Sequence, residues 1–433
     1  MKPKHFILWG INYSPELTGI APCNAALCEH LHAQSHHVRM VTSFCYYPEW
    51  RKLPEDKGVL YRRDVVRGVE VHRCWHYVPK KPSTLKRIFH ELSFVASSWL
   101  RVMTLPRPDA YVVVSPPLLL GFAAWLAGWL KRAPFVFHVQ DLQPDAAVSL
   151  GMMKGGLLLR LLYALESFAY RQAALVSGIT HGMTRAFARK GVPASRILLF
   201  PNGIKLPPTG SLPPPGRFRR RFGIANDELL GIYSGNLGVK HGVEILLKAA
   251  QFSQARPIRT VLCGDGARRE LLEGRARDLG LTNVLFLPLQ AEVEYHEMMV
   301  DADIYFVTQQ AGSGALFFPS KLLKGLALSK AIIVVADEQS ELTLAATEGR
   351  FALVVKPDHP EELAAAQERL AANKDERLAL GRAGRKYVEQ YESKRLLRAY
   401  ESSLCGFLER ACFPYSAPAL PLVPGNPNPE SAP

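Results

Sequence analysis

Short apolar runs rich in β-branched residues alternate with longer helical patterns over almost the whole chain. Runs of this length predict strands, and apolar residues spaced three and four apart predict amphipathic helices. The alternation therefore predicts parallel sheets with helices on both faces. The expected strands are HFILWGI, VRMVTS, VEVHRC, AYVVVS, FVFHVQ and ILLFPN in the first half, and LLGIYSG, RTVLCGDG, VLFLPL, DIYFVT, AIIVVAD and FALVVK in the second.

A proline-rich segment, KLPPTGSLPPPGRF at 205–218, interrupts the alternation because its prolines and glycines sustain neither periodicity. The 433 residues also exceed one ordinary core. We therefore predict an α/β protein of two doubly wound, Rossmann-like domains, with the cleft between them as the default site. The predicted parts are a first domain at 1–205, a linker at 206–218, a second domain at 219–391, a helix at 392–411 that could cross back to the first domain, and a disordered tail at 412–433.

The formal net charge of +14 lies entirely in the first half of the chain. Residues 1–205 hold 26 Lys and Arg against 12 Asp and Glu, whereas the remainder holds 27 of each. A basic domain of this kind indicates an anionic partner, either nucleic acid, an anionic membrane surface or a phosphorylated acceptor. A solvated basic face with no partner is the alternative.

Three further patterns concern the compartment in which the protein works. The N-terminus MKPKHFILWGINYSPE lacks the features of a signal peptide and instead predicts a first strand. The apolar segment at 118–130 is shorter than the roughly 20 residues that span a bilayer, so it predicts a buried core helix rather than one that dips into a membrane. The seven cysteines are odd in number and form no CxxC or zinc pattern, which indicates reduced thiols in the cytosol.

The turn YSGNLGVKHG follows an expected strand and carries glycines, an amide and a lysine. Gly235 lets the backbone approach a ligand closely, and a helix expected to start near His241 would present free N–H groups and the positive end of its dipole. Asn236 adds hydrogen bonds, and Lys240 adds a full charge. Together these groups suit a diphosphate, although glycine turns with one lysine are common.

Two other loops of the second half repeat this pattern. Gly264 and Gly266 follow a strand in CGDG. In FFPSKLL, Pro319 makes an irregular entry to a helix, Ser320 occupies the position of an N-cap, and Lys321 stands in the first turn. A lysine there is unfavourable for the helix dipole and should be compensated, for example by an anionic ligand. An exposed, solubilising lysine is the alternative.

Polar residues also follow two strands of the first half. Asn12, Glu16 and Gly19 lie in the loop after the first strand and could line the opposite wall of the cleft. His138 and Asp141 stand at the end of FHVQD. A single histidine in a strand is more often a satisfied core residue, but the crowding of polar groups at this strand end favours a catalytic role.

The order of these motifs resembles that of the family-4 retaining glycosyltransferases with the GT-B fold, in particular the bacterial colanic acid fucosyltransferase type. The resemblance runs from about residue 4 to about residue 400 and rests on GINYSPELTGI, YYPEW, YVPKKPSTLKRIFHELSF, FHVQD, FPNG, YSGNLGVKHG, GDG, FLPLQ, PSKLL and SELT. It implies transfer of a sugar, with GDP-fucose favoured as donor, to a lipid-linked oligosaccharide during exopolysaccharide synthesis. It further implies a peripheral, cytoplasmic enzyme at the anionic inner face of the plasma membrane, with no metal, no cofactor and no nucleic-acid partner.

The resemblance also assigns roles to residues of the second domain, which would hold most of the donor. Lys240 and Asn236 would hold its diphosphate, and Lys321 and Ser320 would add a further phosphate contact. Glu341 in SELT would bond the hydroxyls of the ribose or the sugar.

Other residues would surround the rest of the donor. Pro288 and Leu289 would flank the base, Gly19 would approach the diphosphate from the first domain, and His138 would face the sugar ring. The acceptor hydroxyl would attack from the front face and pass its proton to the departing phosphate, which retains the anomeric configuration.

The chain departs from the family pattern in three places. Lys205 follows PNGI where an acidic residue is commoner. Leu316 and Lys324 stand where many family-4 enzymes have two glutamates, and Ala21, Pro22 and Cys23 stand where the subgroup has Gly, Lys and Tyr. The alternatives are therefore a sugar-nucleotide epimerase of the same fold and a non-catalytic subunit that binds a sugar nucleotide. A dinucleotide oxidoreductase is disfavoured because no GxGxxG follows the first strand.

Overall fold

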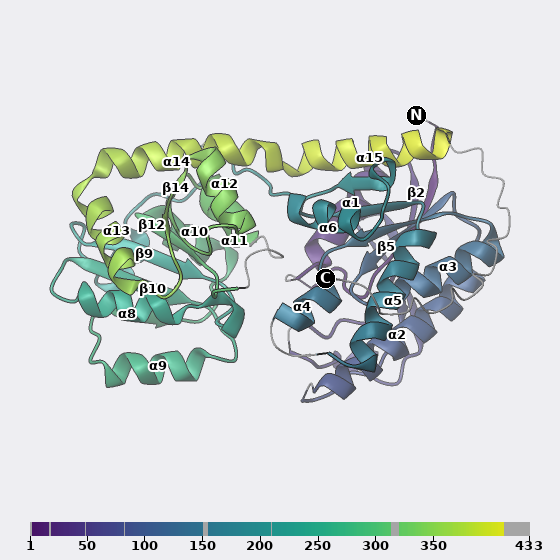
Figure 1. Ribbon diagram of the computed structural model, residues 1–433, viewed down its shortest axis with the longest axis horizontal. Coiled ribbons are helices and arrows are strands. Elements are labelled where there is room, and N and C mark those ends of the chain that lie inside the picture. Colours follow the sequence, from purple (N-terminus) through teal and green to yellow (C-terminus); the bar gives the residue numbers. More distant parts are fainter. Residues whose placement is uncertain are drawn as a thin grey trace, which may run out of the picture.

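The computed structural model describes residues 2–16, 19–47, 49–81, 83–149, 155–208, 210–312 and 320–410. Two lobes each contain one sheet, and a run of helices along the top of Figure 1 connects them. The first lobe contains β1 (His5–Trp9), α1 (Ala21–Ala33), β2 (His37–Ser43), β3 (Tyr61–Val66), β4 (Val69–Cys74), α2 (Thr84–Thr104), β5 (Ala110–Ser115), α3 (Leu120–Lys131), β6 (Phe135–Val139), α4 (Gln143–Ser149), α5 (Leu157–Gln172), β7 (Leu175–Gly178), α6 (His181–Arg189) and β8 (Ile197–Leu199).

The second lobe begins at the end of the proline-rich segment, whose last two residues are the first two of α7. It contains α7 (Arg217–Phe222), β9 (Leu229–Ser234), the 3-10 turn η3 (Val239–His241), α8 (Glu244–Phe252), β10 (Ile258–Cys263), α9 (Arg269–Asp278), β11 (Val284–Leu287), α10 (Glu292–Asp301), β12 (Ile304–Thr308), α11 (Ser320–Ala327), β13 (Ala331–Val335), α12 (Glu341–Gly349), β14 (Ala352–Val355), α13 (Pro360–Ala372) and α14 (Lys374–Val388). The helix α15 (Ser393–Arg410) follows.

The two sheets are doubly wound, as the alternation predicted. Their strand orders are β3-β4-β2-β1-β5-β6-β7-β8 and β11-β10-β9-β12-β13-β14. The order reverses beside β1 in the first sheet and beside β9 in the second. Such switch points open crevices beyond the carboxyl ends of the strands, where ligands bind. The loops after β1 and β9 therefore occupy the expected binding positions.

The alternation missed two strands of the first lobe, the four-residue β7 and the strand β3. The strand β3 pairs with β4 in antiparallel orientation. Along this strand, exposed residues alternate with half-buried ones, so its sequence YRRDVV lacks the continuous apolar character of a covered parallel strand. Arg67 and Gly68 join the pair with φ angles of 48° and 84°. Two consecutive left-handed residues are typical of a tight hairpin.

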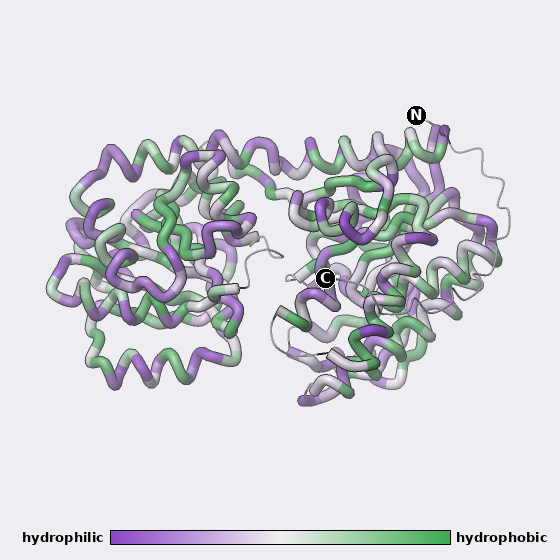
Figure 2. Tube along the Cα trace, viewed as in Figure 1, coloured by the Kyte–Doolittle hydropathy of each residue, from purple (hydrophilic) through white to green (hydrophobic). Residues whose placement is uncertain are grey.

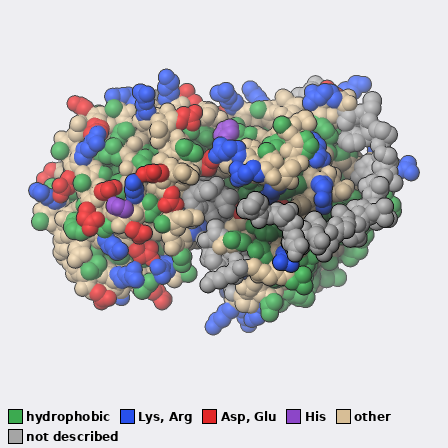
Figure 3. All heavy atoms as spheres, in the orientation of Figure 1, with side chains coloured by type: hydrophobic (Ala, Val, Ile, Leu, Met, Phe, Trp, Pro, Cys, Tyr) green, Lys and Arg blue, Asp and Glu red, His purple; other side chains and the backbone are tan. Residues whose placement is uncertain are grey.

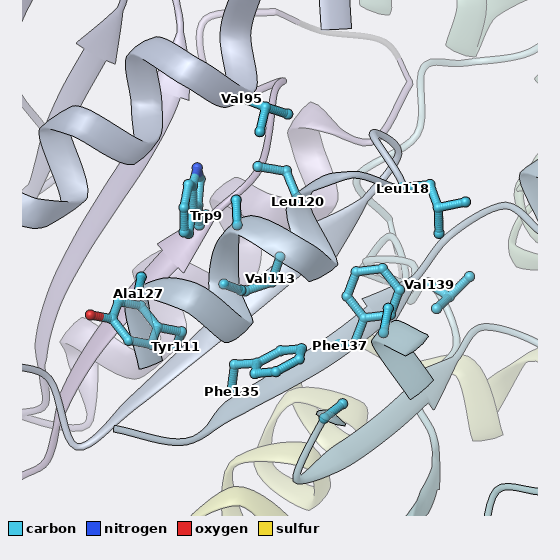
Figure 4. Packing of buried hydrophobic residues seen from close by; sticks show 14 of the residues in the cluster. Trp9, Val95, Tyr111, Val113, Leu118, Leu120, Ala127, Phe135, Phe137 and Val139 are labelled. Atoms are coloured by element: carbon cyan, nitrogen blue, oxygen red, sulfur yellow. The ribbon is translucent and has the colours of Figure 1, made fainter. Parts of the chain in front are cut away.

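The core of the first lobe lies on both faces of its sheet. The register aligns Trp9 with Val113, and Val113 with Phe137, so these side chains form a row across three strands below α3 (Figure 4). Trp9 satisfies its buried indole by donating from Nε1 to Ser98 Oγ at 2.9 Å. Because helices cover both faces, the central strands β1, β5 and β6 are mostly apolar, whereas the outer helices alternate in hydropathy (Figure 2).

The helix α15 leaves the second lobe and packs on the first (Figure 1). Its Tyr400 stacks on Phe200 with ring centroids 3.9 Å apart and planes 4° from parallel. Its Glu401 is bonded to Nε2 of His30 at 2.8 Å and to Nε2 of His36 at 3.2 Å. One face of the first sheet is thus covered by a helix from the far end of the chain.

Two sequence predictions concern the membrane and the cysteines. Within the described ranges, no helix is both long and apolar enough to cross a bilayer. The segment at 118–130 forms most of α3, which is buried on one side only: Ala124 is fully buried, but Trp129 is 47% exposed. The cysteines that the structure describes are all free thiols. Cys412 and the tail at 412–433 lie outside the described residues.

Candidate active site

The loops after β9 and β10 pack directly against each other at the carboxyl edge of the second sheet. The N–H of Gly235 donates to the carbonyl of Cys263 at 2.9 Å, and the N–H of Leu237 donates to that of Asp265 at 2.8 Å. A Cβ at Gly264 would lie 1.8 Å from the carbonyl oxygen of Gly235. Gly235 and Gly264 are thus needed for the contact between the two loops, whether or not they also let a ligand approach the backbone.

Gly266 belongs to the same contact. A Cβ there would lie 2.7 Å from Asn236 Oδ1 and 2.8 Å from the carbonyl oxygen of Leu237. The side chain of Asn236 is exposed at the outer side of the loop. The second glycine of CGDG therefore also serves the packing of the two loops.

The helix after the glycine turn begins later than predicted. Val239–His241 form a 3-10 turn, and α8 begins at Glu244 rather than near His241. Gly242 interrupts the helix with a φ of 56°, and its Cα faces the backbone of Gln310, where a Cβ would lie 3.2 Å from Gln310 Cα. The N–H of Gln310 donates to the carbonyl of Lys240 at 3.1 Å. The turn that carries Lys240 is thus fixed to the end of β12.

Lys321 reaches from the first turn of α11 to the glycine turn. Its Nζ donates to the hydroxyl of Tyr233 at 2.5 Å and lies 4.2 Å from the centroid of that ring. The Tyr233 hydroxyl in turn donates to the carbonyl of Asn236 at 2.7 Å. A Cβ at Gly235 would lie 3.0 Å from Nζ. The ammonium group therefore lies directly against the loop that was predicted to bind a diphosphate.

Two ammonium groups share this site. Burial, and secondly the charge of Lys240, lower the pKa of Lys321 to about 7. Burial and the same two lysines lower the pKa of His241 to about 3. Withdrawing a lysine from water beside a second cation costs free energy that an anionic ligand would offset. Lys321 therefore still carries the free-energy cost that the sequence predicted an anionic ligand would offset.

Asp141 of the first lobe faces this site. It follows β6, and burial raises the pKa of its carboxyl group while the charge of Lys240 opposes that rise. Since Lys240 belongs to the second lobe, the two side chains are near enough to interact across the cleft. A second contact joins the lobes at Glu341, the first residue of α12, which forms an ion pair with Arg185 of α6.

His138, which the resemblance expects to face the sugar ring, is buried at the end of β6. Its ring is buried, with Nδ1 2.9 Å from Ser177 Oγ and Nε2 2.8 Å from Gln140 Nε2. Gln140 Oε1 accepts from Asn202 Nδ2 at 2.8 Å, so Gln140 Nε2 donates to His138 Nε2. The proton of the neutral ring therefore lies on Nδ1.

The burial of His138 lowers the pKa of its imidazole to about 4. The hydroxyl of Ser177 lies 3.0 Å from that of Tyr400 on α15. A neutral ring whose nitrogens are both engaged cannot exchange protons with a substrate without breaking this chain of hydrogen bonds. We therefore assign His138 a positioning role: it fixes Gln140, next to Asp141.

Asn12 and Glu16 likewise hold loops together. Asn12 Nδ2 donates to Glu16 Oε2 at 2.8 Å, and Glu16 Oε1 accepts from the N–H groups of Tyr46 and Tyr47 at 2.9 and 3.0 Å. The carboxylate thus joins the loops after β1 and β2, and its burial raises its pKa. Gly19 adopts a φ of 65°, and a Cβ there would lie 3.8 Å from the Tyr47 ring.

The remaining predicted residues follow β11 or stand at the start of α11 in the sequence. Leu289 is 58% exposed after β11, and the carbonyl of Pro288 accepts from Cys263 Sγ at 3.2 Å. Ser320 is the first residue of α11, whereas Pro319 and Leu316 lie outside the described residues. Over the described part of the chain, no group of three or more His, Cys, Asp or Glu side chains is placed to hold a metal ion.

Sequence reasoning missed Tyr233, Arg185 and Asn202 as members of the site. An aromatic residue in an apolar strand predicts core packing, which hides the hydroxyl of Tyr233 from a sequence argument. Asn202 stands in the FPNG motif, and this motif was the only signal for it. Arg185 lies in an amphipathic helix with no distinguishing pattern.

Models of two protein families match the two lobes of the chain. The family model of the glycosyl transferase 4-like domain matches residues 18–203, and that of glycosyl transferases group 1 matches residues 216–387. The chain is 34% identical over 367 residues to the putative colanic acid biosynthesis glycosyl transferase WcaI of Escherichia coli K12, covering 83% of this chain and 90% of that protein. It is 24% identical over 261 residues to the probable glycosyltransferase WbjE of Pseudomonas aeruginosa, covering 60% of this chain and 65% of that protein.

Solved structures share the fold over almost the full chain. Sucrose-phosphate synthase from Thermosynechococcus elongatus aligns with a TM-score of 0.73 at 18% identity, covering 94% of this chain and 99% of the other. Anabaena Alr3699/HepE in complex with UDP-glucose aligns with a TM-score of 0.67 at 16% identity, covering 93% and 100%. WaaG, a glycosyltransferase of lipopolysaccharide biosynthesis, aligns with a TM-score of 0.64 at 17% identity, also covering 93% and 100%.

Proposed function

Since this chain belongs to the family-4 glycosyltransferases with the GT-B fold, we propose that it transfers a sugar from a nucleotide-sugar donor to a lipid-linked oligosaccharide in exopolysaccharide synthesis. The observation that carries the proposal is the position of Lys321, half-buried against the glycine turn with Lys240 as a charged neighbour. Two adjacent cations and a glycine loop suit a pyrophosphate, which is the leaving part of a nucleotide sugar. The homologue in colanic acid synthesis supports the pathway class.

The chemistry follows from where negative charge develops. As the bond between the anomeric carbon and the phosphate oxygen breaks, charge grows on the diphosphate. Lys321 and Lys240 are positioned before the reaction begins, so they stabilise that charge without having to move. The acceptor hydroxyl, on the same face as the leaving group, transfers its proton to the departing phosphate oxygen, and the configuration is retained. This route needs no protein base, which agrees with the hydrogen bonds that both ring nitrogens of His138 already make.

The donor that we propose is GDP-fucose, and thermal unfolding tests it. The melting temperature is measured with GDP, UDP and dTDP and with GDP-fucose, UDP-glucose and dTDP-rhamnose. A ligand at a hundred times its Kd stabilises by about 2.7 kcal/mol, so the true donor should raise Tm by several degrees. Guanine nucleotides are expected to give the largest shift. A flat response to the whole panel would refute the nucleotide site.

Measuring product formation distinguishes a sugar transferase from an epimerase and from a non-catalytic subunit. Release of GDP from GDP-fucose should depend on added lipid-linked acceptor. An epimerase would instead change the ¹H NMR spectrum of the donor with no acceptor present, and a non-catalytic subunit would bind the donor and release nothing.

The pH dependence of donor binding should report Lys321. With a pKa of about 7 in the free protein, this lysine loses its charge as the pH rises through 7, whereas a bound diphosphate favours the protonated form. Binding above pH 7 must therefore take up a proton, and affinity for GDP should fall by up to about tenfold per pH unit between pH 7 and 8.5. Calorimetry at pH 8 in Tris and in HEPES measures the uptake.

The matched control for this dependence is Lys321→Arg, because a guanidinium stays protonated throughout this range. Its binding of GDP should show no proton uptake. Equal observed heats for the wild-type protein in the two buffers, whose ionisation enthalpies differ, would show no proton uptake and would contradict the assignment.

We also propose that the protein works at the cytoplasmic face of an anionic membrane. The surplus of positive charge in residues 1–205 supports this location, since polybasic surfaces are attracted to anionic lipids. A lipid-linked acceptor would be presented at the same surface.

A further inference from the structure

Three helices of the first lobe form one continuous outer layer. The helix α3 contacts both α2 and α5, so the three lie side by side on one face of the first sheet. Each helix buries one side against the sheet and leaves large apolar side chains on the other. We call the exposed side of this layer the α2–α3–α5 face; it is represented by Leu85, Phe89, Leu92, Trp129, Leu157 and Leu161.

The exposure of this face is high for apolar residues. Leu85 is 79% exposed, Leu157 84% and Leu161 61%. In Figure 3, hydrophobic side chains gather over the lower side of the right-hand lobe, where Figure 1 places α2, α3 and α5. A single exposed leucine is ordinary, but several large exposed apolar side chains on three adjoining helices mark a surface that binds something apolar.

The three helices of this face carry no exposed carboxylate. They contain two carboxylates, Glu91 and Glu166. Glu166 is 1% exposed and is bonded to Lys190 Nζ at 2.6 Å and to the Tyr170 hydroxyl at 2.9 Å. Glu91 is half-buried, and its burial raises its pKa to about 7. Helices of the second lobe, in contrast, carry acidic first turns, as in α10, α13 and α14.

Positive charge, however, borders the face. Lys80 and Lys81 precede α2, Lys86 and Arg87 lie in its first turn and a half, and Arg160 lies in α5; all five are exposed. The face thus combines exposed apolar side chains with neighbouring Lys and Arg, and its three helices carry no exposed carboxylate. Such a face matches a surface that is apolar inside and negatively charged at its boundary. A bilayer of anionic phospholipid has that composition.

A second copy of the chain is a poorer occupant. Packing this face on itself would bring the same lysines and arginines together, with no exposed carboxylate on the three helices to pair with them. Desolvating like charges at an interface opposes association. A lipid surface, however, supplies the missing negative charge.

We propose that the protein lies on anionic lipid through the α2–α3–α5 face, with Leu85, Phe89 and Leu157 inserted among the headgroups and the lysines at phosphate level. This inference rests on the proposed function, since it names the surface that meets the acceptor's membrane. Gln143 Nε2 of α4 lies 3.5 Å from Glu91 Oε1 of α2, and Asp141 is two residues before Gln143. The lipid-facing layer therefore adjoins the first-lobe wall of the cleft, where a lipid-linked acceptor would enter.

Co-sedimentation tests the proposal with vesicles of phosphatidylcholine alone and with 30% phosphatidylglycerol. The wild-type protein should bind the anionic vesicles at least tenfold more tightly, and binding should weaken as salt rises. The variant Leu85→Asp/Phe89→Asp should lose at least tenfold of this binding. Its matched control is Leu344→Asp/Leu378→Asp, which changes two leucines of the second lobe that are each 49% exposed, and this control should bind as the wild type does.

A second variant tests the charge separately. Lys81→Glu/Lys86→Glu keeps every apolar residue of the face and should lose binding to anionic vesicles only. Equal wild-type binding to both lipid compositions, or wild-type binding by both variants, would overturn the proposal. Light scattering that shows a dimer dissociated by Leu85→Asp/Phe89→Asp would also overturn it, since the face would then be an interface between copies.

Donor binding distinguishes failure of this inference from failure of the proposed function. The face variants should keep the wild-type Tm and the wild-type response to GDP or UDP, because none of the changed residues contacts the lysine site. Vesicle binding without any nucleotide response would support the face and refute the transferase. A nucleotide response without vesicle binding would support the transferase and refute the role of the face.

Discussion

Replacing Lys321 with methionine should lower kcat/KM for the nucleotide-sugar donor by about 10²–10³, the usual cost of removing one preorganised group that stabilises developing charge. The side chain keeps its length but loses the ammonium that lies at 2.5 Å from the Tyr233 hydroxyl and against Gly235. Folding should not suffer, since burial and Lys240 already disfavour the charged form of this lysine. The Tm of the variant should equal or exceed that of the wild type.

The matched control is Lys324→Met, which removes a second lysine of α11 whose Nζ lies 5.2 Å from the centroid of the Tyr295 ring. Its kinetics should stay within about twofold of wild type, because Lys324 is exposed and lies against Tyr295 rather than against the Tyr233 ring. If both variants lose activity alike, or neither does, the diphosphate site is not at Lys321.

The second large effect is expected for Gly264→Ala, which should abolish nucleotide binding and lower the free energy of unfolding by about 3 kcal/mol. The new Cβ would lie 1.8 Å from the carbonyl oxygen of Gly235. Since the obstacle is backbone and not a flexible side chain, the loops after β9 and β10 must separate. Urea denaturation and the thermal response to GDP or UDP measure the two effects.

Gly280→Ala separates this collision from the general cost of replacing glycine. Gly280 has a φ of 63°, and a Cβ added there would meet nothing within 4 Å, so its replacement should cost only the roughly 1–2 kcal/mol of a left-handed alanine. It should leave nucleotide binding intact. Wild-type stability and binding in Gly264→Ala would show that the two loops do not need this close contact.

The fold could be predicted because buried parallel strands leave a strong local signal. Each apolar run of the second half became a strand of one sheet, and the proline-rich segment marked the change of lobe. The strand β3 was missed because it lies at a sheet edge, where exposed residues alternate with half-buried ones and no continuous apolar run forms. The start of α8 was misplaced because Gly242 takes a left-handed conformation against Gln310, a contact that local propensity does not encode.

The site was less predictable than the fold. Lys321 could be singled out locally, because a lysine in a first helical turn conflicts with the helix dipole. Its partner Tyr233 could not, since the contact joins elements that are distant in sequence. For His138, a crowd of polar residues suggested exposure to a substrate, whereas Ser177 and Tyr400 supply hydrogen-bonding partners in the interior. Polar clusters at strand ends thus identify a region better than they identify a role.

The crossing of α15 changes how this protein can be dissected or recombined. The matched group 1 family region ends at 387, yet Tyr400, Leu404 and Cys405 complete the hydrophobic core beside Phe6 and Leu8 of the opposite lobe. An isolated fragment ending near residue 205 would display that uncovered core to water and aggregate. A chimera that exchanges N-terminal halves between two such enzymes must therefore transplant 393–410 together with the N-terminal half, as one discontinuous segment.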